Sequence, residues 1–183
     1  MHPEVLVEHI RKMKEATDKP WGINVPLLYP EIDRLMNIII QEGVKIVFTS
    51  AGSPKKWTPL LKSHGITVVH VISSTLFAKK CEEAGVDAVV AEGFEAGGHN
   101  GREETTTLTL IPNVVESCSL PVIAAGGMAQ RMQGINKQSL MIQGVPVLVR
   151  SIQRMAEVKQ IRQIVVVARP ELFSQLKQWK IEY

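Results

Sequence analysis

Short apolar runs alternate along this chain with segments that have helical periodicity. Three of the runs begin at a glycine and cover residues 43–48, 65–69 and 85–90. Glycine adopts the left-handed conformation that ends a helix without a steric penalty, so we expect a helix to end and a strand to follow at each of these points. Two further runs, at 21–25 and 121–125, predict one strand before and one after these three.

The segments between the apolar runs predict amphipathic helices. Leu35, Ile38 and Ile39 form one apolar stripe, and Pro3 lies in the first turn of a helix that opens the chain. Strands that alternate with helices at such short intervals are typical of right-handed crossovers and a parallel sheet. The predicted fold class is therefore α/β, a parallel sheet of βα repeats. The unit length suits a TIM-type (βα) barrel, although a doubly wound sheet has the same local pattern.

The number of predicted strands is too small for a closed barrel. The pattern supplies five, with a sixth at residues 164–168. We therefore expect an incomplete TIM-barrel-like domain whose sheet edges need a cover, which a homodimer would provide. An open, flavodoxin-like sheet is the alternative architecture.

Composition places the chain among folded proteins and argues against several partners. Hydrophobic residues make up 45% of the chain and charged residues 21%, which is enough to bury a core. The net charge of +3 comes from scattered lysines and arginines, without the basic cluster that nucleic-acid binding requires. The apolar runs are too short to span a bilayer and no signal peptide is evident. We expect a cytoplasmic protein without nucleic-acid or membrane partners.

Several reactive side chains have simple structural interpretations. Cys81 and Cys118 lack metal-type spacing, and we interpret them as buried free thiols in a reducing cytosol, with no metal site. His70 falls inside a predicted strand and is interpreted as a core histidine with satisfied hydrogen bonds, whereas His64 caps a helix end. The lysines at 55–56 are interpreted as a solvated first turn of a helix rather than an anion site.

Candidate chemistry is concentrated in residues 91–101, A-E-G-F-E-A-G-G-H-N-G, directly after the apolar run at 86–90. Ligands bind at the carboxyl ends of strands in barrels and doubly wound sheets alike. Glycines let backbone approach a ligand closely, and an imidazole titrates near neutral pH. His99 is therefore a candidate base, although a histidine among glycines can also be a loop residue that bonds to backbone. Glu103 and Glu104 precede a threonine-rich helix start, where the helix dipole explains them.

Two further segments complete a recognisable pattern. Together with the threonines at 105–107 and P-V-I-A-A-G-G at 121–127, the loop at 91–101 resembles the nitronate monooxygenase family, formerly called 2-nitropropane dioxygenase. That family is similar to the flavin-dependent enoyl-acyl-carrier-protein reductases. The resemblance covers about residues 1–129 and implies a partial FMN-binding (βα) barrel. It implies an oxidoreductase that oxidises alkyl nitronates with O2, or a reductase that acts on an enoyl thioester.

The resemblance also implies roles for individual residues. The catalytic base of the family corresponds to His99, which would remove the proton next to the nitro group or bind the nitronate. The backbone of the glycine-rich segments would lie against the flavin ring and offer amides to its phosphate. The implied flavin contacts are Asn24, Gly97, Gly98, Gly126 and Gly127.

From about residue 122 the sequence resembles a second family. A-G-G-M-A-Q-R-M at 125–132 and the segments at 136–140 and 144–149 resemble the start of the cytidylyltransferases of the methylerythritol phosphate pathway. This resemblance implies a partial, Rossmann-like nucleotidyltransferase segment over residues 130–183, with CTP and Mg²⁺ as ligands. Arg131 and Lys137 would stabilise charge at the attacked phosphorus.

The nucleotidyltransferase pattern has one departure. Ala129 stands where the second loop glycine usually falls, and its methyl group can obstruct close approach of a phosphate. Arg131 and Lys137 would then be an ordinary loop arginine and turn lysine. The sequence at 122–127 suits either family, which makes it a natural crossover point for an engineered chimera, a genomic rearrangement or an assembly artefact.

We expect both resemblances to be partial. The flavin family would have two more strands before residue 1, and the nucleotidyltransferase family would continue past Tyr183. The leading functional hypothesis is an FMN-dependent oxidoreductase of the nitronate monooxygenase type. Nucleotidyl transfer and a catalytically inactive chimera are the alternatives.

Overall fold

The protein's structure, a computed structural model, describes residues 2–97, 101–126 and 140–157, together with the single residues 159, 164, 166, 176 and 179. One sheet contains β1 (Gly22–Pro26), β2 (Ile46–Ser50), β3 (Thr67–Ile72), β4 (Ala88–Glu92) and β5 (Val122–Ala125). The helices that alternate with these strands are α1 (Pro3–Ala16), α2 (Ile32–Gln41), α3 (Thr58–Ser63), α4 (Thr75–Ala84) and α5 (Thr107–Ser117). The predicted alternation of strands and helices is therefore present.

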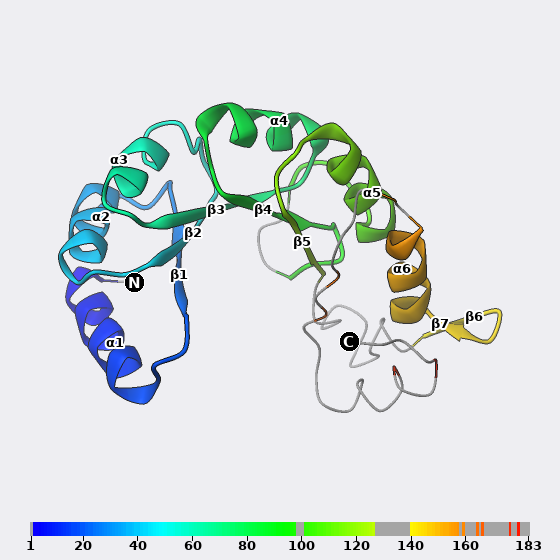
Figure 1. Ribbon diagram of the computed structural model, residues 1–183, viewed down its shortest axis with the longest axis horizontal. Coiled ribbons are helices and arrows are strands. Elements are labelled where there is room, and N and C mark those ends of the chain that lie inside the picture. Colours follow the sequence, from blue (N-terminus) through cyan, green and yellow to red (C-terminus); the bar gives the residue numbers. More distant parts are fainter. Residues whose placement is uncertain are drawn as a thin grey trace.

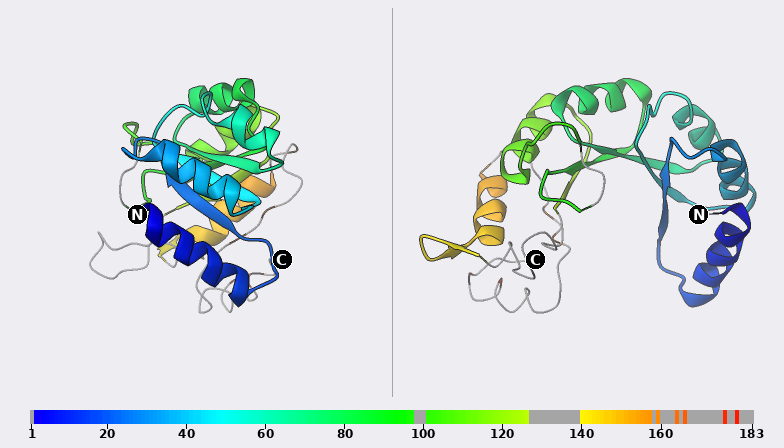
Figure 2. Two further views of the ribbon diagram at one scale, coloured as in Figure 1. Left: turned by 90° about the vertical axis from the view of Figure 1, so that its left-hand side faces the viewer. Right: turned by 180° about the vertical axis from the view of Figure 1, so that it is seen from behind.

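The strands follow one another across the sheet in sequence order. All neighbouring pairs from β1 to β5 are parallel. In a doubly wound sheet the strand order reverses at a switch point and helices cover both faces. Here the helices lie on the outside of an arc and the strands on its inside (Figure 1), as the view from behind also shows (Figure 2). The predicted parallel sheet of βα repeats is confirmed, and its order is that of a barrel wall rather than of a flavodoxin-like sheet.

Left-handed glycines end the helices where the sequence predicts. The three glycines Gly43, Gly65 and Gly85 have φ values of +66°, +69° and +76°. No described atom lies within 4 Å of a Cβ built on any of them, so the backbone conformation and not the available space favours glycine there. Each is followed by a buried residue, namely Val44, Ile66 or Val86. These residues join helix to strand, which is why the strands begin two or three positions later than the apolar runs.

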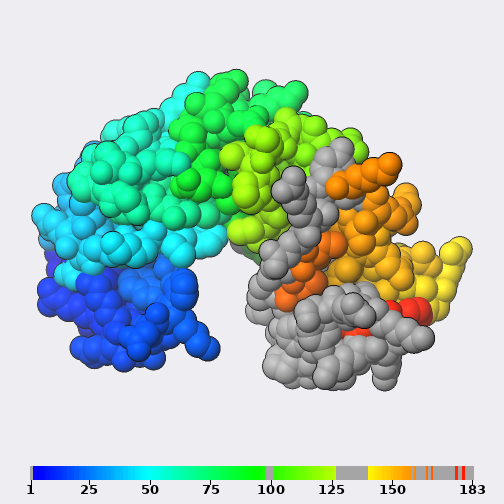
Figure 3. Space-filling view, viewed as in Figure 1, coloured from blue at the N-terminus to red at the C-terminus, as the bar shows by residue number. Residues whose placement is uncertain are grey.

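The main core lies between the sheet and the outer helices. Val47, Val68 and Val89 lie on the neighbouring strands β2, β3 and β4. They belong to one buried cluster that also contains Met36 and Ile39 of α2. Because side chains alternate along a strand, the positions between these residues face the concave side of the arc. The space-filling view shows this side as a hollow (Figure 3).

His70 of β3 belongs to the outer, helix-covered layer. Its side chain is 4% exposed, and its Nδ1 lies 2.6 Å from the hydroxyl of Thr49 on β2. Burial lowers the pKa of His70 to about 4, although a hydrogen bond with the backbone of Gly52 acts in the opposite direction. The imidazole is therefore neutral at physiological pH, which confirms the prediction of a satisfied core histidine.

The structure also describes the cysteines, His64 and the two lysines. Cys81 and Cys118 are both free; Cys81 is buried, and burial raises the pKa of its thiol to about 12, whereas Cys118 is only half-buried. His64 is the C-cap residue of α3. The lysines at 55–56 lie just before α3 and form exposed ion pairs with carboxylates of neighbouring helices.

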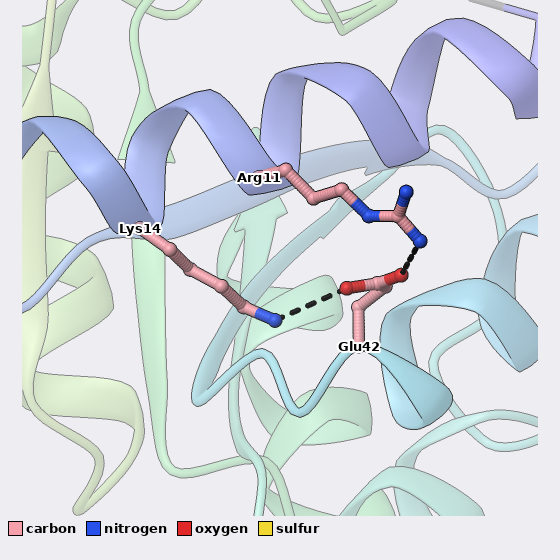
Figure 4. A network of polar contacts seen from close by, with 3 residues as sticks. All are labelled: Arg11, Lys14 and Glu42. Atoms are coloured by element: carbon pink, nitrogen blue, oxygen red, sulfur yellow. Dashed lines mark hydrogen bonds and ion pairs between the residues drawn. The ribbon is translucent and has the colours of Figure 1, made fainter.

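A polar network joins the first two helices (Figure 4). Glu42, the C-cap residue of α2, accepts hydrogen bonds from Lys14 at 3.1 Å and from Arg11 at 3.2 Å. The hydrogen bond from Lys14 lowers the pKa of the Glu42 carboxyl. Both cations lie on α1, so the network holds α1 against the end of α2.

A second, smaller unit follows β5 along the chain. It contains an antiparallel hairpin of β6 (Met141–Ile142) and β7 (Val145–Pro146), and α6 (Val147–Ala156). Val149 and Ile152 of α6 form a separate buried cluster with Leu176. The strand predicted at 164–168 falls mostly outside the described residues. No helix among the described residues has the length and apolar character needed to cross a membrane.

Candidate functional site

The glycine-rich loop leaves β4 at the carboxyl edge of the sheet. Glu92, the last residue of β4, is in register with Ala125, the last residue of β5. The Gly93 amide then donates to the carbonyl of Ala125 at 3.0 Å, and the Phe94 amide donates to the carbonyl of Thr105 at 2.9 Å. These bonds place the start of the loop beside the end of β5 and the segment that leads into α5.

The structure brings together some of the predicted site residues. Gly97 and Gly126 are described, and both follow the carboxyl ends of adjacent strands, β4 and β5. Asn24 is exposed on β1, which is the edge strand at the other end of the strand order from β5. It alternates with the helix-facing Val25, so it lies on the concave side of the sheet. The remaining predicted residues fall outside the described residues: Gly98, His99, Gly127, Arg131 and Lys137.

The glycines near this edge are of two kinds. A Cβ at Gly93 would lie 2.6 Å from the amide nitrogen of Thr107, and a Cβ at Gly101 would overlap the side chain of Ser73. Packing within the chain therefore requires glycine at these two positions. In contrast, no described atom lies within 4 Å of a Cβ built on Gly97, and the nearest to one on Gly126 is the Thr107 hydroxyl at 3.6 Å. Glycine at 97 and 126 has no such packing reason.

Thr107 connects the loop to α5. Its amide donates to both carboxylate oxygens of Glu95, at 2.9 and 3.0 Å. Among the described residues, its buried hydroxyl has no hydrogen-bond partner. A buried polar group without a partner is costly, and at the rim of a hollow it is a candidate ligand contact.

Glu92 is a candidate site residue that sequence reasoning missed. It alternates with the helix-facing Ala91 and Val89, so its half-buried carboxyl lies on the concave side next to the loop. Burial raises the pKa of the Glu92 carboxyl, which makes it a better proton carrier and a candidate hydrogen-bond partner for a ligand. The available signal was an acidic residue that directly follows four apolar strand positions and precedes a glycine.

The described residues offer no metal centre. Within the ranges that the structure describes, no group of three or more His, Cys, Asp or Glu side chains could hold a metal ion.

A parallel sheet in sequential order with a glycine-rich loop at its carboxyl edge defines the class of barrel-type α/β proteins that bind ligands at that edge. The comparison with known families makes this specific. The profile of the family described as nitronate monooxygenase matches residues 28–137, and the chain belongs to this family. A second profile, described as a MobA-like NTP transferase domain, matches residues 121–183. The two matches overlap around β5 and the segment after it.

Individual relatives agree with the first match. A 5-hydroxy-7a-methyl-1-oxo-octahydro-1H-indene-4-carboxyl-CoA dehydrogenase of Rhodococcus jostii is 35% identical over 118 residues, which are 64% of this chain and 33% of that protein. A probable nitronate monooxygenase of Staphylococcus haemolyticus is 32% identical over 153 residues, covering 76% of this chain and 43% of that protein. The solved structure of FabK from Thermotoga maritima has 44% identity and a TM-score of 0.66, over 69% of this chain and 40% of that chain. The chain thus spans less than half the length of these relatives.

Proposed function

We propose that this chain forms part of an FMN-dependent oxidoreductase of the nitronate monooxygenase type, which oxidises alkyl nitronates with O2. The observation that carries the proposal is the contrast among the glycines at the carboxyl edge. Folding explains Gly93 and Gly101, whereas a Cβ on Gly97 or Gly126 would clash with no described atom, the nearest being the Thr107 hydroxyl, 3.6 Å from a Cβ on Gly126. Close approach of a ligand is the common reason for glycine at such positions.

The residues at this edge fit a flavin. Backbone at Gly97 and Gly98 would lie against the ring, and amides at Gly126 and Gly127 would receive the phosphate. Asn24 would contact the flavin from β1. The Thr107 hydroxyl, which has no partner among the described residues, supports a polar ligand beside Gly126. When bound, FMN supplies the redox chemistry, accepting electrons from the substrate and passing them to O2.

His99 would act as the general base. In the sequence it falls between Gly97 and Gly101, after strand β4, and substrates of barrel enzymes bind at the carboxyl ends of the strands. An imidazole can remove the proton from the carbon next to a nitro group, or bind the anionic nitronate when protonated. Glu92, whose burial favours the protonated carboxyl, would offer a second hydrogen-bonding group on the concave side.

The substrate class has one close alternative. An enoyl thioester would be reduced by an enzyme of the same fold, as the resemblance to the flavin-dependent enoyl-acyl-carrier-protein reductases implies. Both substrates are small molecules that would bind above the same flavin edge, so the position of the site does not depend on the choice between them.

The decisive experiment combines a spectrum with one variant. The purified chain, supplied with FMN and then separated from unbound FMN by gel filtration, is expected to absorb near 450 nm, about where flavins absorb. His99→Ala should keep this absorbance and lower nitronate oxidation by roughly 100-fold or more, as the loss of a general base does. His64→Ala, on the helix-capping histidine, is the matched control and should change neither. A colourless protein that takes up no added FMN would exclude the proposal.

Nucleotidyl transfer is the second candidate because a nucleotidyltransferase profile matches residues 121–183. In this case residues 1–129 would be a partial flavin domain and 130–183 a partial nucleotidyltransferase segment. Arg131 and Lys137 would stabilise the charge on a CTP–Mg²⁺ complex during transfer. Lys137→Ala should then weaken Mg²⁺-dependent CTP binding, while Lys79→Ala on α4 should not. If neither FMN nor CTP binds, the chain is a catalytically inactive chimera.

A further inference from the structure

Ala51 has a backbone conformation that its local structure does not require. Among the described residues, Ala51 and Gln143 are the only non-glycine residues with a positive φ, +51° and +49°. Gln143 and Gly144 form the two-residue turn of the β6–β7 hairpin, where two successive positive φ values are the usual geometry. Ala51 lies in no hairpin but directly after β2, in residues 50–53, which we name the β2 turn. Because the left-handed region crowds a methyl group against the backbone, contacts around Ala51 have to maintain this conformation.

Leu27, directly after β1, holds the β2 turn from one side. Its amide donates to the carbonyl of Ser50 at 2.7 Å. A Cβ at Gly52 would lie 2.9 Å from the Cβ of Leu27, so the backbone of the turn rests on this side chain. Leu27 therefore contacts the residue before Ala51 and the residue after it.

A buried polar pair holds the β2 turn from the β3 side. Thr49 and His70 are cross-strand neighbours, 1% and 4% exposed, and the Thr49 hydroxyl lies 2.6 Å from His70 Nδ1. The imidazole also forms a hydrogen bond with the backbone of Gly52. The helix-facing positions on either side of His70 along β3 are Val68 and Ile72, so packing alone would be satisfied by an aliphatic residue. A buried polar network specifies one arrangement of the groups that it joins, and here these include the turn.

The β2 turn borders the concave side of the sheet. Ser50 alternates with the helix-facing Thr49, so it lies on the concave side, and it is in register with Pro26 at the end of β1. Asn24 of β1 lies on the same side. The exposed residues at 51–53 follow at the carboxyl edge, where ligands of barrel enzymes bind. Strained backbone that its surroundings maintain is typical of ligand sites.

We propose that the β2 turn is a further FMN-contacting segment of the carboxyl edge and that Thr49 and His70 are the residues that position it. The contact is through the backbone, because the small side chains of Ala51, Gly52 and Ser53 leave the main chain open to a planar ring. The contact with FMN rests on the proposed function. The positioning of the turn by Thr49 and His70 is a property of the protein without a ligand.

The first experiment maps FMN onto the turn. Backbone amide NMR spectra of the full chain are recorded with and without FMN, and we expect the resonances of residues 50–53 to shift. Gln143 and Gly144 are the internal control, since they also have positive φ values but lie in the second unit, and their resonances should stay unchanged. FMN binding without a shift at 50–53 overturns the inference. If the chain binds no FMN, the contact fails together with the proposed function, and the next experiment still decides whether Thr49 positions the turn.

The second experiment removes one buried hydroxyl. Thr49→Val keeps the shape of the side chain, and Thr58→Val is the matched control, because Thr58 is also 1% exposed and its hydroxyl has no partner among the described residues. In Thr49→Val without FMN, the NMR order parameter of the Gly52 amide should fall from about 0.85, the value of rigid backbone, toward about 0.6. The Kd for FMN should rise roughly 5-fold, the equivalent of one hydrogen bond. Thr58→Val should change neither quantity.

The two variants separate positioning from general stability. An unchanged order parameter at Gly52 in Thr49→Val overturns the positioning role, and so does an equal fall in Thr58→Val. Weaker FMN binding by the same factor in both variants overturns the link between the turn and the ligand.

The third experiment measures the strain at Ala51. Glycine adopts the left-handed conformation freely, so Ala51→Gly should raise Tm by about two degrees. Ala16→Gly, at the exposed last residue of α1, is the control and should not raise Tm, because a helical alanine carries no such strain. A lower Tm in Ala51→Gly shows that the conformation is unstrained and overturns the reason for assigning a ligand contact to the turn.

Discussion

The helix-covered face of the sheet and its carboxyl edge differ in the hydrogen bonding and pKa of their polar groups. On the covered face, His70 is bonded to Thr49 and Gly52 and is held in its neutral form. At the edge, the Thr107 hydroxyl has no partner among the described residues, and the Glu92 carboxyl is half-buried with a raised pKa. The buried imidazole is thus paired, as burial of a polar group requires, although the buried hydroxyl of Thr58, the first residue of α3, also has no partner among the described residues. The edge contains features that folding does not explain, and such features are typical of ligand sites.

The first prediction tests whether the covered face depends on neutral His70. In the folded chain its pKa is about 4, whereas the ordinary histidine value is 6.5. Below pH 6.5 the unfolded chain therefore binds a proton that the folded chain does not, so stability falls as pH falls from 6.5 to 4. The full loss should be about 3 kcal/mol. Urea unfolding at pH 7, 6, 5 and 4.5 measures this slope, and His70→Gln should remove most of it. An equal slope in the variant would show that other groups cause the loss.

The second prediction separates the two kinds of glycine at the edge. Gly93→Ala should destabilise the fold by about 2 kcal/mol, because the new methyl group meets the Thr107 backbone and the Glu95 carboxylate. Gly97→Ala should change stability by less than about 0.5 kcal/mol, since its Cβ meets no described atom. Urea unfolding of both variants gives the stabilities, and FMN titration should show weaker binding for Gly97→Ala. Equal destabilisation by the two substitutions would remove the distinction between packing glycines and ligand glycines.

The third prediction concerns the polar surface of the covered side, where the effect is smallest. Glu42→Gln removes the charge that pairs with Lys14 and Arg11. Because these cations lower the pKa of Glu42, its contribution is present above the ordinary carboxyl pKa of 4.5 and is lost as pH falls below that value. At pH 7 the variant should unfold a degree or two lower, roughly the effect of an exposed ion pair, and at pH 3 the difference should vanish. Glu8→Gln, in an exposed pair within α1, should show a still smaller change in Tm.

Local pattern was enough to predict most of the element sequence. The left-handed glycines, the helix cap at His64 and the buried state of His70 all follow from residue types at particular spacings. Local pattern does not determine which face of the short helix α4 is buried. Leu76 and Phe77 are 58% and 46% exposed, while the buried side of α4 consists of Ala78 and Cys81. Which stripe of a helix is buried depends on how the helix sits on the sheet, and a short helix with apolar residues on several sides leaves that open.

The glycine-rich loop was predicted to follow β4, and the structure shows it there, but the contacts that support the loop were not predicted. The order of motifs placed the loop at a strand end and suggested family membership, which the profile match then showed. For Glu92 the sequence carries only the weak signal of an acidic residue at the end of an apolar strand, and for Glu95 it carries none. Glu103 and Glu104 stand closer in sequence to the start of α5, yet the carboxylate bonded to its first amide comes from Glu95. Such a contact depends on the path of the loop and cannot be inferred from spacing.

The sequence by itself determined the βα alternation, the ends of the helices and the strand that the glycine–histidine loop follows, because each depends on residues close together in the chain. Only the tertiary structure decided the order of the strands and the single helix-covered face. A βα unit has the same local sequence pattern whether the next strand is added to one side of the preceding strand or to the other. The tertiary structure also separated glycines that packing requires from glycines that it does not, since that difference depends on atoms brought together from distant parts of the chain.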